Sequence, residues 1–133
     1  MSLDPETRKN IVLYRIEKAK ATWDDAIFNI QGKRWNTASN RLYYALFHAA
    51  SALLISEGIL ANTHKGFLLQ ISNHYVRTEI LTKEEGKLIR NLFDLRNEDD
   101  YEDFTNLTEE DLKEYIPKAE ALLNKLIALN KYT

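Results

Sequence analysis

The segment from Leu42 to Ile55 places the strongest constraint on the fold of this 133-residue chain. It is apolar on almost every side, and its polar members include only His48 and Ser51 besides two tyrosine hydroxyls. With 14 residues it is too short to span a bilayer. A helix that is apolar nearly all round must be surrounded by other helices. The sequence therefore predicts a helical protein built around this segment.

Start and stop signals divide the rest of the chain into further helices, because apolar residues recur at helical spacing nearly everywhere. The signals are Asp4 with Pro5 and then Gly32 for the first helix, Asn36 or Thr37 and then Gly58 for the second, Thr63 for the third, Thr82 with Glu85 for the fourth, and Thr108 with Asp111 for the fifth. Pro117 should kink the fifth helix or delay its true start. Short connections favour antiparallel neighbours. We expect an all-α, antiparallel four-helix up-and-down bundle with an additional shorter helix, in a single domain over residues 1–133.

Composition narrows the classes of function. The net charge of -2 gives no overall attraction to nucleic acid or to an anionic membrane. The absence of cysteine excludes disulfides, thiol catalysis and cysteine-ligated metal. No signal peptide is visible, so we expect a cytoplasmic protein without a membrane partner.

The segment 95–104 is the most unusual polar stretch, because it combines one arginine, five carboxylates and a tyrosine. Arg96 ends an apolar stripe, where it can meet these acids or a bound anion. The carboxylates could hold a divalent cation, but EF-hand spacing is absent. We favour a solvated turn in which Arg96 pairs with Asp100 or Asp103.

Two further groups of polar residues are candidates for a site. Arg41, Tyr44 and His48 share one face of the central helix, either as satisfied structural groups, which we favour, or as a polar stripe facing a groove. His64 lies in the first turn of the third helix, where unpaired amides favour anions. The sequence leaves open whether it contacts a ligand, caps the helix or faces solvent. The histidines lack the paired spacing of a metal site, so we expect no metal or cofactor.

Three segments carry a resemblance to a known family. Residues 39–54, with the sequence SNRLYYALFHAASALL, resemble its second helix. Residues 63–67, THKGF, resemble its "THKG" helix start, and residues 95–101, LRNEDDY, resemble its "R-x-x-x-D-Y" stretch. Together they cover most of residues 36–104. The chain thus resembles the HEPN superfamily, and within it the small, stand-alone prokaryotic proteins.

The resemblance implies an antiparallel helical bundle that often forms homodimers. Many family members are toxins that cut RNA and pair with a nucleotidyltransferase antitoxin. Their R-x(4–6)-H motif binds phosphate through arginine and uses histidine as acid or base. In this sequence Tyr101 stands where that histidine would follow Arg96, and tyrosine is a poor base at neutral pH. Arg41 and His48 fit the spacing, but on the second helix rather than at the family's position.

Our first hypothesis is a HEPN-like dimer that binds RNA or a nucleotide as the toxin-like partner of a nucleotidyltransferase. The alternatives are a helical interaction protein whose Arg96–Asp100 pair is structural, and a metal-independent ribonuclease. The sequence leaves open whether the protein is an enzyme. The catalytic candidates are Arg96 and Tyr101, and the binding candidates are Arg41, Tyr44, His48, His64, Asn97 and Asp100.

Overall fold

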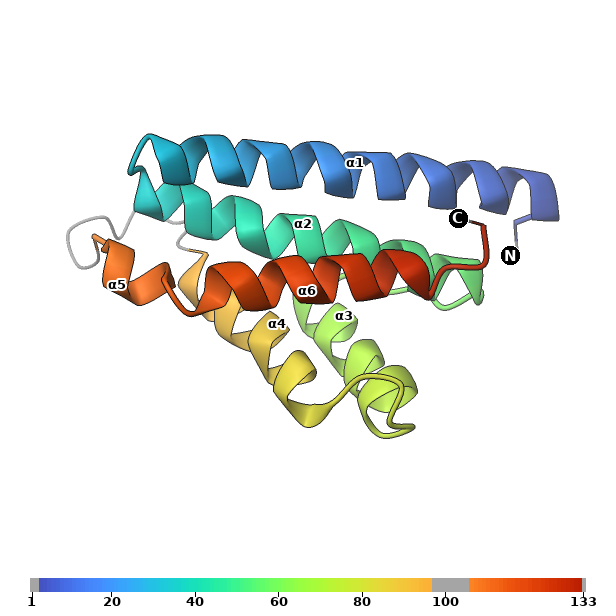
Figure 1. Cartoon of the computed structure of the whole chain (residues 1–133). Coiled ribbons are helices and arrows are strands. Elements are labelled where there is room, and N and C mark those ends of the chain that lie inside the picture. Colours follow the sequence, from blue (N-terminus) through green and yellow to red (C-terminus); the bar gives the residue numbers. More distant parts are fainter. Residues whose placement is uncertain (1–2, 97–105, 133) are drawn as a thin grey trace.

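The computed structural model describes residues 3–96 and 106–132, and all regular structure within them is helical. Figure 1 shows these helices in sequence order. They are α1 (Pro5–Gln31), α2 (Trp35–Ser56), α3 (His64–Ile71), the π-helix η1 (Ser72–Val76), α4 (Lys83–Leu95), α5 (Glu109–Leu112) and α6 (Tyr115–Ala128). The predicted all-α class is therefore confirmed.

Helix α2 lies at the centre of the molecule, as its apolar sequence predicts. It packs against α1, α3, α4, α5 and α6, and no other helix has so many neighbours among the described residues. Its buried residues cover most of its circumference and include Leu42, Tyr43, His48 and Leu54. The side that carries Tyr44, Phe47, Ser51 and Ile55 is only partly buried. The core of the protein is thus the surface of one helix, covered by the others.

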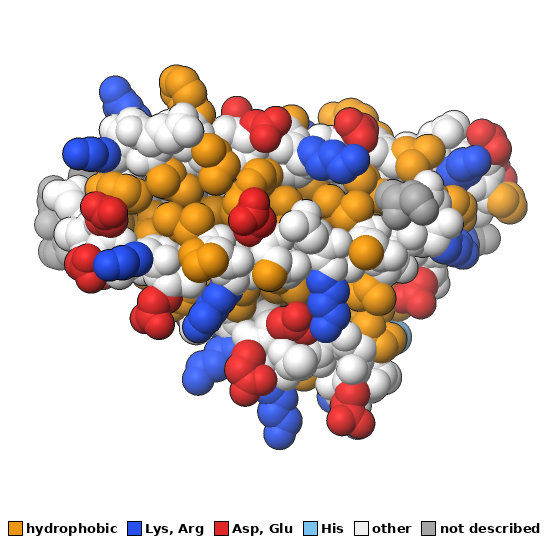
Figure 2. Space-filling view, in the orientation of Figure 1, with side chains coloured by type: hydrophobic (Ala, Val, Ile, Leu, Met, Phe, Trp, Pro, Cys, Tyr) orange, Lys and Arg blue, Asp and Glu red, His pale blue; other side chains and the backbone are white. Residues whose placement is uncertain are grey.

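The long helix α1 packs chiefly on α2 and forms an antiparallel hairpin with it (Figure 1). Alanines on both helices, including Ala19, Ala26, Ala45 and Ala49, are almost fully buried, which lets the two backbones approach closely. Helix α6 lies along another side of α2. Figure 2 shows hydrophobic side chains gathered in a band that runs along the molecule between α1 and α6. None of the described helices is long and apolar enough to cross a membrane.

Most of the predicted helix boundaries are confirmed. Asp4 and Thr63 cap their helices through side-chain hydrogen bonds, and Thr82 and Thr108 both form capping boxes. Gly58 takes a left-handed conformation, with φ of 77°, immediately after α2. Pro117 was predicted to kink the C-terminal helix or delay its start. The break that separates α5 from α6 confirms this.

The predicted start of α2 is wrong. The helix begins at Trp35 with Arg34 as its cap, and no side chain caps it. Asn36 instead accepts a hydrogen bond from the backbone N–H of Leu107 at 2.8 Å. Thr37 lies within the helix. Asn36 could cap a helix, but its side chain makes a tertiary contact instead, and local sequence does not reveal such a contact.

The π-helix η1 continues α3 and packs against α4, and no pattern in the sequence predicts it. In η1 the buried Tyr75 donates a hydrogen bond to the carboxylate of Glu57, just beyond α2. Burial and this contact raise the pKa of Tyr75. Val76 packs on Gly86 of α4 so tightly that a Cβ at Gly86 would lie 2.7 Å from Val76 Cγ2.

We predict that the effect of Gly86→Ala on the free energy of unfolding changes sign with the residue at position 76. In the native background the added methyl clashes with Val76, which should lower the free energy of unfolding by about 1 kcal/mol after the gain in helix propensity. In a Val76→Ala background the clash is gone, so the same substitution should stabilise by up to about 1 kcal/mol. Urea unfolding of the four variants measures both effects. Equal effects in the two backgrounds would contradict the close approach.

Candidate functional site

Two arginines, two tyrosines and a histidine meet where α2, α3 and the end of α4 come together. The guanidinium carbon of Arg41 lies 5.3 Å from the centre of the Tyr44 ring. That of Arg96 lies 4.0 Å from the centre of the Phe93 ring and 5.6 Å from that of Tyr43. We call Arg41, Tyr43, Tyr44, His64, Phe93 and Arg96 the arginine–aromatic cluster. Arginine stacked on aromatic rings is a surface that suits both phosphates and planar bases.

His64 is the centre of this cluster. Its Nδ1 lies 2.8 Å from the Tyr43 hydroxyl and its Nε2 lies 3.4 Å from that of Tyr44. The imidazole also contacts the rings of Phe47 and Phe93. Because neutral imidazole has one donor nitrogen and one acceptor nitrogen, it can connect the two tyrosine hydroxyls. Thr63, not His64, caps α3, and His64 is half-buried rather than fully exposed to solvent.

The position of Arg96 depends on a contact between α4 and α2. The hydroxyl of Ser39, which is fully buried, donates to the backbone carbonyl of Leu95 at 3.1 Å. This bond satisfies a carbonyl at the C-terminus of α4 and fixes the residue before Arg96. Leu107 is held in the same way by Asn36, one turn earlier on α2. Both sides of residues 97–105 are therefore anchored to the first turns of α2.

His48 lies one turn beyond Tyr44 in a different environment. Only 8% of it is exposed, and Arg15 Nη1 of α1 lies 3.4 Å from its Nδ1. Burial, followed by the charges of Arg15, Lys18 and Arg41, lowers the pKa of His48 to about 4. The imidazole is consequently neutral at pH 7 and can accept a hydrogen bond from Arg15.

The structure brings most of the predicted residues together. Arg41, Tyr44, His64 and Arg96 belong to one cluster, and His48 adjoins it through a ring contact with Tyr44. Arg41, Tyr44 and His48 lie on one face of α2, and each has a polar partner: Arg41 donates to Asn40 Oδ1, the Tyr44 hydroxyl lies beside His64, and His48 lies beside Arg15. The predicted residues Asn97, Asp100 and Tyr101, and the pairing of Arg96 with an acid in 98–103, lie outside the described residues.

Sequence reasoning missed three contributors. Phe93 precedes Arg96 by three residues, so helical spacing could have found its contact with the guanidinium. Tyr43 neighbours Tyr44 and was hidden among the core residues. Arg15 lies 33 positions before His48, and no local pattern connects the two.

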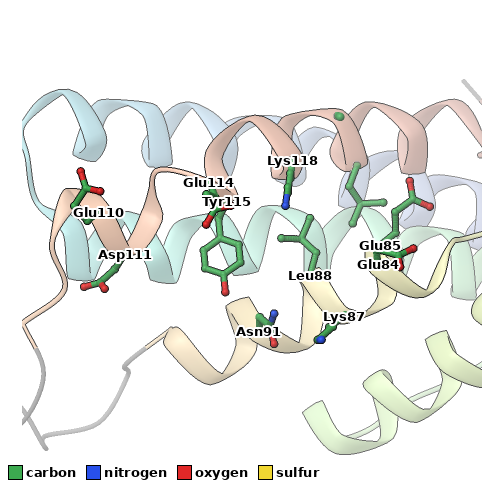
Figure 3. Close-up of a pocket in the computed structure, with 12 residues that line it drawn as sticks. Glu84, Glu85, Lys87, Leu88, Asn91, Glu110, Asp111, Glu114, Tyr115 and Lys118 are labelled. Atoms are coloured by element: carbon green, nitrogen blue, oxygen red, sulfur yellow. The ribbon is translucent and has the colours of Figure 1, made fainter.

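The chemistry available in the cluster is the recognition of anions and of planar rings. Arg41 and Arg96 supply positive charge, and Tyr44 and Phe93 supply partly exposed rings. Arg15 and Lys18 of α1 add positive charge beside the adjoining His48. No group of three metal-ligating side chains occurs within the described ranges 3–96 and 106–132. A groove of about 750 Å³ lies elsewhere, between α4, α5 and α6 (Figure 3), and shares no lining residue with the cluster.

Comparison with known proteins places the chain in a family. Residues 12–129 match the HEPN domain, so the chain belongs to the HEPN family. It is 34% identical over 119 residues to a "UPF0332 protein" of Thermotoga maritima, covering 90% of each chain. It is also 26% identical to a Methanocaldococcus jannaschii protein named "Putative toxin MJ0142", over 83% of this chain and 75% of that one. The resemblance to the HEPN family that was expected from the sequence is confirmed.

The lowered pKa of His48 predicts a pH-dependent stability. Unfolding returns the imidazole to a pKa near 6.5, so below that pH the unfolded state binds a proton that the folded state excludes. The free energy of unfolding should fall by roughly 2 kcal/mol from this residue between pH 7 and pH 5. Urea unfolding at the two pH values should show that His48→Gln, which keeps an acceptor for Arg15, reduces this loss.

His74→Gln removes an exposed histidine of η1 and is the matched control. If His74→Gln flattened the pH dependence and His48→Gln did not, the assignment to His48 would be wrong.

Proposed function

We propose that this HEPN protein binds RNA or a nucleotide through the arginine–aromatic cluster, as the toxin-like component of a pair with a nucleotidyltransferase. The observation that carries the proposal is the stacking of Arg41 and Arg96 on neighbouring rings around His64. Single-stranded RNA is bound by proteins through stacking of bases on aromatic rings and guanidinium planes, together with contacts to phosphate.

Local charge supports an anionic ligand despite the overall charge of -2. The field of Arg15, Lys18 and Arg41 is strong enough to help lower the pKa of His48. The same positive potential attracts phosphate groups. In the first 41 residues eight basic residues stand against five acidic ones, and these residues supply α1 and the start of α2.

The partners are part of the proposal. Two Methanocaldococcus jannaschii relatives carry the printed name "Putative toxin", which supports the proposal of a toxin-like protein that is inhibited by a second component. Family membership favours a homodimer and a nucleotidyltransferase antitoxin. The apolar band between α1 and α6 offers a surface that a second copy could cover (Figure 2).

A ribonuclease that uses His48 is the less favoured alternative. A histidine with a pKa of about 4 is neutral at pH 7, so it cannot serve as the general acid, and it is a weak base. His48 is also 92% inaccessible, as its exposed fraction is 8%. These properties count against His48 as the acid or base, so we favour binding without cleavage. A ribonuclease that uses His64 is the other form of this alternative.

Arg96→Ala tests the binding proposal. It removes the cation from the rings of Phe93 and Tyr43 and should weaken binding of a labelled single-stranded RNA roughly tenfold, measured by fluorescence anisotropy at fixed salt. Arg90→Ala removes an exposed arginine from the same helix and should change affinity little. Unchanged affinity in Arg96→Ala, with a lower melting temperature, would favour the alternative in which Arg96 is structural.

Incubation of labelled RNA in EDTA tests catalysis separately. We expect no cleavage by wild-type protein, because His48 is buried and neutral and Tyr101 replaces the histidine of the family motif. Denaturing gels after long incubation measure this. Cleavage by wild type that Arg96→Ala and His64→Ala both lose would instead establish a metal-independent nuclease in the cluster.

A further inference from the structure

The groove between α4, α5 and α6 carries charge of the opposite sign to that of the arginine–aromatic cluster. Its volume is about 750 Å³. Five carboxylates line it, from Glu84, Glu85, Glu110, Asp111 and Glu114, against the ammonium groups of Lys87 and Lys118. The groove is therefore acidic, and it is a poor surface for a polyanion such as RNA.

The carboxylates of the groove divide into two kinds. Glu85 and Asp111 are engaged in the capping boxes of α4 and α5, and Glu85 also pairs with Lys125 at 2.8 Å. The other three carboxylates form no hydrogen bond or ion pair with residues 3–96 or 106–132. They belong to Glu84, Glu110 and Glu114. These three are the carboxylates available to a cationic partner.

Acids lie at both ends of the groove, and the apolar surface lies between them, together with Glu114 and Lys118 (Figure 3). Figure 3 shows Glu110 at the end formed by α5 and Glu84 at the opposite end, on α4. Between them the ring of Tyr115 points across the groove toward Asn91, and Leu88 lies beside it. Ala121 and Leu122 complete the apolar lining. This order fits a segment with an apolar anchor in its middle and positive charges on both sides.

We propose that this groove is a docking site for a cationic amphipathic helix of a protein partner. Charge complementarity selects Lys and Arg at the flanks of the helix, and Tyr115 and Leu88 receive its apolar residues. A helix fits better than an extended peptide, because strand addition needs an exposed sheet edge and the described part of the chain has no strand. The proposal does not rest on RNA binding, since the two sites share no residue.

Fluorescence anisotropy with a designed peptide tests the proposal. The probe is a short, labelled, helix-forming peptide with leucines at i, i+3, i+4 and i+7 and lysines and arginines on both flanks. A scrambled peptide of the same composition lacks the apolar stripe. Wild-type protein should bind the patterned peptide at least about tenfold more tightly than the scrambled one.

Two variants locate the binding. The triple change Glu84→Gln, Glu110→Gln and Glu114→Gln should weaken binding of the patterned peptide roughly tenfold. Ala121→Arg places a long cationic side chain at an exposed position of the groove and should weaken it at least as much, while arginine keeps helix propensity high. Circular dichroism confirms that each variant is folded.

Matched controls on α1 change charge and bulk away from the groove. The triple change Glu17→Gln, Asp24→Asn and Asp25→Asn removes the same net charge from exposed positions, and Ala21→Arg adds the same side chain at an exposed position of α1. Both should bind the patterned peptide as wild type does.

Three outcomes would overturn the proposal. The first is equal binding of the patterned and scrambled peptides, or equal losses in the groove and control variants. Either result would mean that net charge alone explains the attraction. A loss of RNA binding in the groove variants, with peptide binding unchanged, would assign the groove to RNA. A change of oligomeric state in Ala121→Arg, seen by sedimentation and without an effect on peptide binding, would assign it to a second copy.

Discussion

The need to bury most of the circumference of α2 determines the rest of this structure. A helix with Leu42, Ala52 and Leu54 on different faces exposes apolar surface until other helices cover it, and each buried leucine contributes roughly 2 kcal/mol. Five helices serve this one segment, and their own contacts with each other are fewer. The site forms around the few polar groups of α2, because each must find a partner from the helix that covers it.

The polar groups of α2 explain why His48 and His64 lie in such different surroundings. His48 faces α1, where burial and nearby cations exclude a proton. His64 approaches α2 from outside and lies between the two tyrosine hydroxyls. Arg41 and Arg96 gain ring contacts rather than burial against carboxylates among the described residues. Positive charge is therefore concentrated near the N-terminal end of α2, where Arg41 and Arg96 lie. The acidic residues of α5 and of the start of α4 line a separate groove.

Sequence predicted the helices well because their signals are local. Apolar spacing, the caps at Asp4, Thr63 and Thr82, and the break near Pro117 each depend on neighbours within one helical turn. The site was predicted only in part, because its contacts join distant segments. Contact between His48 and Arg15 spans 33 positions, and that between Ser39 and Leu95 spans 56. The misplaced start of α2 has the same cause.

The two bonds from Ser39 and Asn36 have an evolutionary consequence. They fix Leu95 and Leu107 independently of the residues between them, so the helices on either side keep their places whatever length of chain joins them. Because the entropic cost of closing a loop grows only slowly with its length, insertions and deletions there should disturb the fold little. Changes of length after Tyr101 should therefore leave Arg96 in place, whereas residues 95–101 carry the stretch that resembles the family motif.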